Sequence, residues 1–444
     1  MARAKKETAL TPEERLQAAL VPDWEWPHKL PENWCWTTVG AINQYVGISA
    51  DPTKAKNETF ELYSVPSSAD NYPEIVLGTD IGSTKQAVKK GDVLLCKINP
   101  RINRVWKVSK YTDHSLLASS EWIVVRNSRL ISNYLMWCFR SPYFRGYMLS
   151  NVSGVGGSLM RAQPKFVQGY PVPVPPLAEQ QRIVDRIESL FAKLDEAKEK
   201  AQAVVDSFEN RRAAILHKAF TGELTAKWRE EHGVSIDNWK TTRFDSVAAI
   251  RSNLVDPAEY QSFPHIAPDN IEKKTGVLLE YHTIAEDGVT SGKNRFYSGQ
   301  ILYSKIRPYL SKAVVVDFDG LCSADMYPIE AYQNARCLWY YMLSDEFLLQ
   351  ASTAGSRSVL PKINQKELSA LTVHLPTNDR EQEEIARILD ELFDKEQQTK
   401  EAAEIVLDQI ELMKKTILAR AFRGELGTND PNEESAVELL KQIF

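Results

Sequence analysis

Basic and amide side chains follow a strand-like run in the first third of the chain. Residues 91–110 read GDVLLCKINPRINRVWKVSK. After the apolar run this segment contains six candidate nucleic-acid contacts: Lys97, Asn99, Arg101, Asn103, Arg104 and Lys107. Arginine and asparagine carry hydrogen-bonding groups that fit guanine and adenine edges, whereas lysine suits phosphates. A strand followed by a tight basic turn predicts a hairpin that presents these groups to a nucleic acid.

Matching basic segments occur in the second half of the chain. The segment KIRPYLSK (305–312) contains Lys305, Arg307, Tyr309 and Lys312, and SGKNR (291–295) contains Lys293, Asn294 and Arg295. Two Gly/Ser stretches also correspond: GGSLMRAQPK (156–165) with Ser158, Arg161 and Lys165, and AGSRSVLPK (354–362) with Arg357 and Lys362. Each alone could be a solvated turn. Their recurrence at matched places favours a binding role.

Catalytic and metal-binding motifs are absent from the sequence. It contains no GxGxxG, no GxxxxGK[ST] and no HExxH, and its seven histidines are scattered. Asp195 and Lys198 have a carboxylate–lysine spacing seen in nucleases, but they lie on a strongly helical stretch, where a solvated helix face is the simpler reading. The sequence therefore predicts no catalytic residues, no metal site and no cofactor bound by this chain.

Composition and charge are typical of a soluble cytoplasmic protein. Five cysteines without CxxC spacing favour reduced thiols, and no apolar run reaches the roughly 18 residues of a membrane helix. The net charge of −5 conceals a gradient: residues 33–175 carry +7, residues 231–375 carry −3 and residues 376–444 carry −8. This gradient suggests a polyanionic partner for the first segment and a different one for the acidic tail.

An internal repeat organises the whole chain. ILHKAFTGEL (215–224) and ILARAFRGEL (417–426) share seven of ten positions, and the register extends back to Glu179 and Glu381. Mixed strand and helix patterns precede each copy. The expected fold is α+β with a pseudo-two-fold repeat, divided as follows: an N-terminal extension (1–32), a first globular domain (33–175), a central helix (176–232), a second globular domain (233–375) and a C-terminal helix with its tail (376–444).

Each repeated helix shows a 3.5-residue apolar period, which is typical of a coiled coil. The first seam comprises Ile183, Ile187, Leu190, Leu194, Val204, Phe208 and Ile215, and the second comprises Ile385, Leu389, Leu392, Val406, Ile410, Met413 and Ile417. Gly222 and Gly424 stand where C-terminal caps belong. Pairing within one chain predicts a long antiparallel two-helix coiled coil between the two globular domains; homodimerisation through the same seams is the alternative.

The chain resembles the specificity (S) subunits of type I restriction–modification systems. The likeness is strongest in VPVPPLAEQQRIV (172–184), AILHKAFTGELTAKWR (214–229) and TILARAFRGEL (416–426). It implies a non-catalytic subunit with two target-recognition domains that each read half of a bipartite double-stranded DNA target. It also implies a coiled coil that sets the spacer and docks two methyltransferase (M) subunits.

The same resemblance implies further partners. S-adenosylmethionine would bind in the M subunits, and ATP and Mg would act in the restriction (R) subunits. The repeated helix ends suggest Phe220, Glu223, Phe422 and Glu425 as docking residues, and the N-terminal extension is expected to pack against the C-terminal helix or an M subunit. Two alternatives remain at this stage: a scaffold without sequence-specific binding, and a self-sufficient methyltransferase or nuclease.

Overall fold

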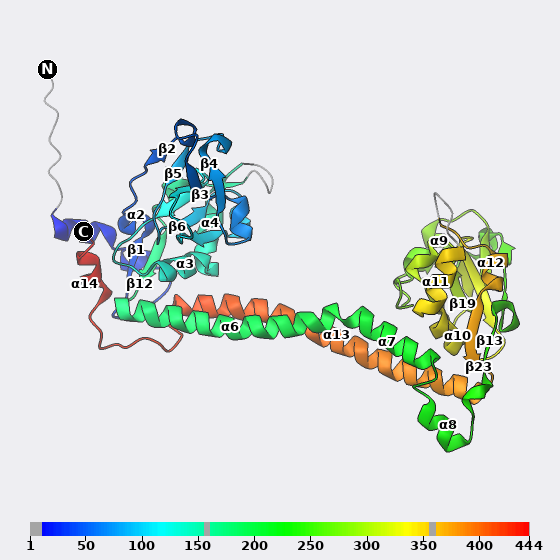
Figure 1. Cartoon of the computed structure of the whole chain (residues 1–444). Coiled ribbons are helices and arrows are strands. Elements are labelled where there is room, and N and C mark those ends of the chain that lie inside the picture. Colours follow the sequence, from blue (N-terminus) through cyan, green and yellow to red (C-terminus); the bar gives the residue numbers. More distant parts are fainter. Residues whose placement is uncertain (1–10, 155–159, 355–360, 444) are drawn as a thin grey trace. The chain divides into compact units, whose positions relative to one another are not determined.

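The computed structural model of the chain describes residues 11–154, 160–354 and 361–443. The chain divides into two compact units (Figure 1). Unit 1 comprises Met1–Lys200 with Val406–Phe444, and unit 2 comprises Ala201–Ile405. Ser158 and Arg357, two of the expected DNA contacts, lie outside the described residues. The architecture is mixed α and β, as the sequence predicts.

Unit 1 contains a globular body of strands and short helices. Its main sheets are a five-stranded one in the order β2-β5-β8-β3-β4 and a three-stranded one in the order β7-β6-β9. Its strands are β1 (Cys35–Thr38), β2 (Ser49–Ala50), β3 (Thr59–Tyr63), β4 (Glu74–Leu77), β5 (Lys85–Ala87), β6 (Val93–Cys96), β7 (Val105–Lys107), β8 (Ser115–Ala118), β9 (Trp122–Val125), β10 (Val152–Ser153), β11 (Arg161–Ala162) and β12 (Pro171–Val174). Its short helices are α1 (Pro12–Ala19), α2 (Val39–Ile42), α3 (Ser132–Arg140), α4 (Pro142–Ser150), α5 (Pro164–Val167) and α14 (Ala436–Lys441).

Unit 2 repeats this arrangement. Its five-stranded sheet has the order β15-β18-β21-β16-β17, and a four-stranded sheet has the order β14-β22-β19-β20. Its strands are β13 (Trp239–Arg243), β14 (Ala248–Ile250), β15 (Leu254–Val255), β16 (Pro264–Ile266), β17 (His282–Thr283), β18 (Lys293–Phe296), β19 (Ile301–Ser304), β20 (Ala313–Val315), β21 (Gly320–Cys322), β22 (Met326–Ala331) and β23 (Thr372–Pro376). Its shorter helices are α7 (Phe208–Phe220), α8 (Ala226–His232), α9 (Ile284–Asp287), α10 (Ala335–Met342), α11 (Asp345–Ala354) and α12 (Gln365–Ala370).

The two five-stranded sheets correspond strand by strand. Each contains one parallel pair, β3 with β8 and β16 with β21, among otherwise antiparallel neighbours. In each unit a separate two-stranded ladder, β1 with β12 or β13 with β23, joins the beginning and end of the globular segment. The repeat detected in the sequence is therefore a repeat of topology, although few residues in these domains are shared.

Two long helices, α6 (Leu177–Asp206) and α13 (Asp379–Ala421), follow the globular segments. In unit 1, Lys198 pairs with Glu411 and Asp195 with Lys414; in unit 2, Arg211 of α7 pairs with Glu396. Unit 2 adds Lys400 over the ring of Phe208 and Arg212 over that of Phe393, so within each unit the residue number on one helix falls as that on its partner rises, and the paired segments run in opposite directions.

The first helix is interrupted, whereas the sequence predicts one continuous rod to Ile215. The α-helix stops at Asp206 and resumes as α7 at Phe208. The hydroxyl of Ser207 donates to the carbonyl of Ala203, and the guanidinium of Arg211 donates to the carbonyl of Val204. The amides of Ser207 and Arg211 still donate to the carbonyls of Ala203 and Ser207, at 3.1 and 3.0 Å, so the interruption is confined to Ser207.

The seam residues differ in burial along the helices. Ile183, Ile187, Phe208, Ile385, Leu389 and Ile410 are buried, and Leu190, Leu194, Val204, Ile215, Leu392 and Ile417 are partly buried. Val406 and Met413 are exposed, at 39% and 49% of their surface, so the paired helices do not bury these two predicted seam positions. The deeply buried seam positions lie mainly next to the globular bodies, where sheet and helix residues supply additional packing.

The two ends of the chain meet within unit 1. Helix α1 contacts α14, and the amide of Ala436 donates to the carbonyl of Asn33 at 2.9 Å. Trp34 and Asn33 donate from their side chains to Asn429 and Asp430. The described part of the N-terminal extension, residues 11–32, thus packs against the C-terminal segment, one of the two partners expected for it; the other, an M subunit, stays a prediction.

Candidate nucleic-acid interface

A basic loop joins β6 to β7 in unit 1. The two strands pair antiparallel, so the predicted hairpin is present. A 3-10 turn at Pro100–Ile102 forms the tip, and Asn99 and Asn103 flank it with φ of 46° and 53°. This left-handed conformation is unfavourable for most residues but is tolerated by asparagine. The tip exposes Arg101 and Ile102 to solvent.

The loop between β19 and β20 in unit 2 has the same backbone path. Its 3-10 turn is Pro308–Leu310, and the flanking Arg307 and Ser311 have φ of 47° and 46°. Neither residue type favours the left-handed region, which costs roughly 1 kcal/mol or more per residue. The conformation has thus been retained at both flanks while the side chains have changed.

Three backbone hydrogen bonds fix each loop in an equivalent way. In unit 1 the amide of Lys97 donates to the backbone carbonyl of Glu121, that of Asn99 to the carbonyl of Met160, and that of Ala162 to the carbonyl of Lys97, at 2.8–3.1 Å. In unit 2 the amides of Lys305, Arg307 and Ile363 make the equivalent bonds to the backbone carbonyls of Asp325, Pro361 and Lys305, at 2.7–2.9 Å. Each loop therefore lies against the segment that follows the Gly/Ser stretch.

One carboxylate holds a basic side chain beside each loop. Glu121 accepts from Arg161 at 2.9 Å in unit 1, and Asp325 lies 3.2 Å from Lys362 and 3.8 Å from Lys305 in unit 2. The sequence analysis missed these acids as site residues, although their positions match in the repeat. They orient cations whose side chains remain 24–51% exposed.

The remaining expected DNA contacts separate by exposure. Arg101, Arg161, Lys165, Arg307 and Tyr309 are exposed, and Lys97, Asn99, Asn103, Arg104, Lys107, Arg295, Lys305, Lys312 and Lys362 are partly buried. Asn103 donates to the carbonyl of Arg140, Lys107 to Asn133, and Lys312 to the carbonyl of Pro268. These three side chains serve their own domain in the structure.

Two expected contacts are buried. Lys293 is 6% exposed and donates to the carbonyl and hydroxyl oxygens of Ser291, and Asn294 is 2% exposed and donates to the carbonyl of Met326. Burial lowers the pKa of Lys293. These side chains are committed within unit 2, so we do not retain them as DNA contacts.

The docking role expected for two phenylalanines is also wrong. Phe422 is fully buried and packs against Tyr134 with ring centroids 5.4 Å apart, and Phe220 is 5% exposed and packs against Tyr341 at 5.0 Å. They join each helix end to its own domain core. Glu223 and Glu425 are exposed, so their docking role stays a prediction.

The repeated Glu-Gln pair forms a buried joint in each unit, which the sequence analysis did not assign. Glu381 accepts from Arg229, Thr225, Asn238 and Trp239 at 2.8–3.0 Å. Glu179 accepts from Thr428 and Arg182, and Arg182 also pairs with Glu433. Gln180 and Gln382 donate to the carbonyls of Pro175 and Pro376 at the start of each long helix.

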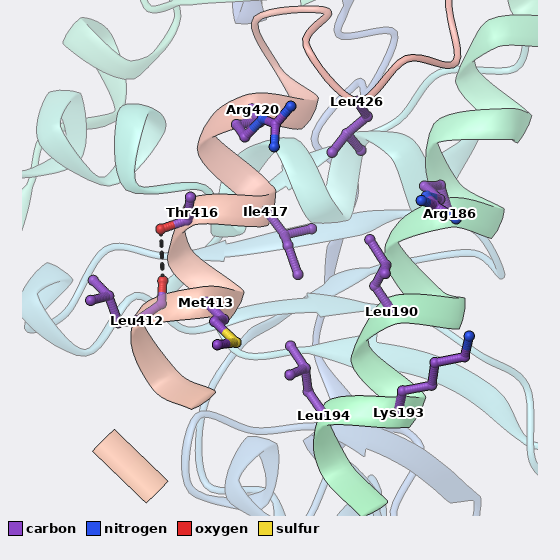
Figure 2. Close-up of a pocket in the computed structure, with 10 residues that line it drawn as sticks. All are labelled: Arg186, Leu190, Lys193, Leu194, Leu412, Met413, Thr416, Ile417, Arg420 and Leu426. Atoms are coloured by element: carbon purple, nitrogen blue, oxygen red, sulfur yellow. Dashed lines mark hydrogen bonds between the residues drawn. The ribbon is translucent and has the colours of Figure 1, made fainter. Parts of the chain in front are cut away.

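An apolar groove lies between α6 and the end of α13 in unit 1, with a volume of about 620 Å³. Figure 2 shows Leu190 and Leu194 on one helix facing Met413 and Ile417 on the other. Arg186, Lys193 and Arg420 also line it, and Leu412 beside it is 64% exposed. The groove explains why the seam is open at Met413.

The described residues contain no group of three or more His, Cys, Asp or Glu side chains placed to hold a metal ion. Nor does any helix in residues 11–154, 160–354 or 361–443 have the length and apolar character needed to cross a membrane. The five cysteines are free and buried, as their spacing predicts.

Known proteins resemble the chain in sequence and in fold. Residues 236–406 match the family model described as type I restriction modification DNA specificity domain. The Escherichia coli type I restriction enzyme EcoDI specificity subunit is 35% identical over 77% of this chain and 82% of its own. The EcoKI specificity subunit from E. coli strain K12 is 25% identical over 72% and 73%.

Solved structures share the fold at 20% identity. The HsdS subunit from Thermoanaerobacter tengcongensis gives a TM-score of 0.62 and covers 90% of this chain and 100% of its own. A chain from a study of complex assembly and conformational transition of the type I R-M system gives 0.71 with the same coverage. With its two matched domains, its paired helices and the EcoDI relative, the chain belongs to the family of type I restriction–modification DNA specificity subunits.

Proposed function

We propose that each globular domain reads one half of a bipartite double-stranded DNA target. The observation that carries this proposal is the matched basic loop, which has the same turn, the same left-handed flanks and the same carboxylate-held cation in both units. Two domains that approach one kind of polymer in the same way, but read different sequences, need an equivalent backbone contact and divergent reading surfaces.

The phosphate contacts would come from exposed and partly buried cations of the two loops and of the segments packed beside them. In the first domain these are Lys97, Arg101, Arg104, Arg161 and Lys165; in the second they are Lys305, Arg307 and Lys362, with Tyr309 beside them. Phosphate contacts position a protein without reading sequence. The net charge of −3 in the second domain implies that the DNA-binding affinity of this chain depends on its partners.

The paired long helices would act as the spacer and as a docking platform for two M subunits. In that role the paired helices would set the distance between the two reading domains. The open groove beside Leu412 and Met413 offers an apolar surface with basic edges to a partner helix. The chain itself would be non-catalytic and cytoplasmic, with S-adenosylmethionine in the M subunits and ATP and Mg in the R subunits.

The test is binding selection with the assembled complex. The chain, purified with its M subunits, is incubated with duplexes that contain a randomised region, and bound duplexes are sequenced. We expect two short fixed half-sites separated by a spacer of constant length and free sequence. Binding without sequence preference would contradict the proposal and support a scaffold instead.

A further inference from the structure

Arg295 marks a place where two otherwise equivalent strands differ. Strand β18 in unit 2 corresponds to β5 in unit 1: Asn294 pairs with Cys322 and Arg295 with Leu321, just as Gln86 pairs with Ala118 and Ala87 with Leu117. The register therefore places Arg295 at the position of Ala87. A large cation stands in one domain where the other has a methyl group.

The two strand residues before Arg295 nevertheless make equivalent hydrogen bonds in both domains. Lys293 and Lys85 each donate to a serine two residues earlier, Ser291 and Ser83. Asn294 and Gln86 each donate to a carbonyl at the start of the equivalent strand, at 3.0 and 2.9 Å. The strand framework is thus preserved, so the change at Arg295 is not a consequence of local refolding.

Three aromatic rings hold the guanidinium of Arg295. Its Cζ lies 4.9 Å from the ring centroid of Tyr297, 5.4 Å from that of Tyr260 and 5.9 Å from that of Phe263. Such contacts are favourable and reduce the freedom of a planar group. The donors of Arg295 are therefore presented in a restricted orientation before any ligand arrives.

The charge of Arg295 has no carboxylate partner among the described residues. Its buried Nε makes no hydrogen bond there, and its Nη1 reaches only the Tyr260 hydroxyl at 3.5 Å. The nearby acid, Glu330, is held by Arg251 at 2.7 Å. A partly buried cation without a counter-charge is costly unless a ligand supplies acceptors.

A polar pocket opens at Arg295, with a volume of about 480 Å³. Arg251, Ser252, Asn253, Tyr297, Gln300 and Glu330 also line it. Asn253 is tied to the strand, because its carbonyl accepts from the amide of Arg295 at 2.9 Å. The pocket therefore offers a polar recess on the second recognition domain, with one side fixed to strand β18.

We propose that Arg295 is a specificity-determining residue that donates to the edge of a guanine in the half-site read by the second domain. This inference rests on the proposed function. Guanine presents two adjacent acceptors, O6 and N7, which fit the two donors of a guanidinium. A phosphate contact serves any sequence and would be expected in both domains, whereas this arginine occurs in one.

The experiment compares wild type, Arg295→Lys and Arg295→Ala in the complex with M subunits, by binding selection on a library with both half-sites randomised. Arg295→Lys keeps the charge but replaces the planar pair of donors with a single ammonium. For Arg295→Ala we expect the preference for guanine at one base pair of the second half-site to fall about 10- to 100-fold; for Arg295→Lys we expect a smaller fall, because an ammonium can still donate to O6 or N7. The first half-site and the salt dependence of Arg295→Lys should be unchanged.

Controls separate this inference from the proposed function and from misfolding. Arg243→Ala removes an exposed arginine of the same unit that is paired with Asp245, and it should leave every base preference intact. Thermal unfolding of each complex checks that the domain is folded. Retained preference at every base in the folded variants, or a uniform loss of affinity across sequences with a weaker salt dependence in Arg295→Ala, would overturn the inference. A wild type without base preference would instead refute the proposed function.

Discussion

Arg229 donates from Nη1 to Oε1 of Glu381 at 2.8 Å, and the carboxylate is fully buried. Glu381 stands at the start of α13, whereas Arg229 lies in α8, just after the end of α7, so one ion pair ties the start of α13 to the segment that follows α7 in unit 2. Burial opposes ionisation of Glu381, but hydrogen bonds from Arg229, Asn238, Thr225 and Trp239 outweigh it and lower its pKa.

Replacing this carboxylate should destabilise unit 2. Glu381→Ala leaves the buried guanidinium of Arg229 without its partner, which typically costs about 3–5 kcal/mol. Urea unfolding followed by tryptophan fluorescence measures the loss, because Trp239 donates to the same carboxylate. Glu384→Ala, which removes an acid paired with exposed Arg387 on the same helix, is the matched control and should change little. Equal effects of both variants would contradict the role of the joint.

The pH dependence of stability should follow the same carboxylate. A lowered pKa in the folded state means that Glu381 contributes stability above its unfolded pKa, near 4.5, and loses it as the pH falls through the lower folded value. Glu381→Gln removes this contribution, so its unfolding free energy should vary less between about pH 5 and pH 3 than that of the wild type. Urea titrations at several pH values test this, and parallel curves would refute it.

Two glycines with left-handed backbone, Gly424 and Gly427, should differ in their tolerance of alanine. Gly424 has a φ of +73°, and a Cβ there would lie 2.4 Å from Cγ of Pro31; Gly427 has a φ of +72° and an open surrounding. Gly427→Ala should cost only the left-handed penalty of about 1–2 kcal/mol, whereas Gly424→Ala should cost more because a proline ring must move. Thermal unfolding of the two variants compares them directly, and an equal loss would show that the Pro31 contact is soft.

Neutralising the loop cations should weaken DNA binding without changing its sequence preference. The double variant Arg101→Ala/Arg307→Ala should lower affinity for all duplexes and reduce the slope of log affinity against log salt by about 1 per lost phosphate contact. Fluorescence anisotropy with the complex at several salt concentrations measures both quantities. Arg387→Ala, on the exposed face of α13, is the control. A changed base preference with an unchanged slope would show that these arginines read bases.

Lengthening the paired helices should lengthen the spacer. A seven-residue insertion near Lys200 in α6, matched by one near Gln409 in α13, keeps the heptad period and adds about 10 Å. The selected spacer should grow by about three base pairs, since each adds about 3.4 Å along the duplex. Insertion in α6 alone breaks the pairing register and should impair binding. A spacer unchanged by the matched insertion would mean that the helices do not set it.

The sequence was most informative where a pattern follows from local physics. Gly222 and Gly424 adopt the left-handed cap conformation, and the strand and turn that contain Lys97 form the expected hairpin. Repetition was harder to interpret. Phe220 and Phe422 recur because each fills an equivalent core, and a buried anchor and a docking residue look alike in sequence. Lys293 and Arg295 are both basic residues of one strand, but Lys293 is buried and donates to Ser291, whereas Arg295 is partly buried among aromatic rings. Only tertiary packing decides this difference, so the sequence could not show it.

The most direct test of two independent reading domains is exchange of residues 33–175 for the corresponding segment of a related specificity subunit, followed by mapping of adenine methylation by the assembled complex. The account predicts that one half-site changes to that of the donor while the other half-site and the spacer remain. A change in both half-sites, or methylation without a defined bipartite site, would contradict it.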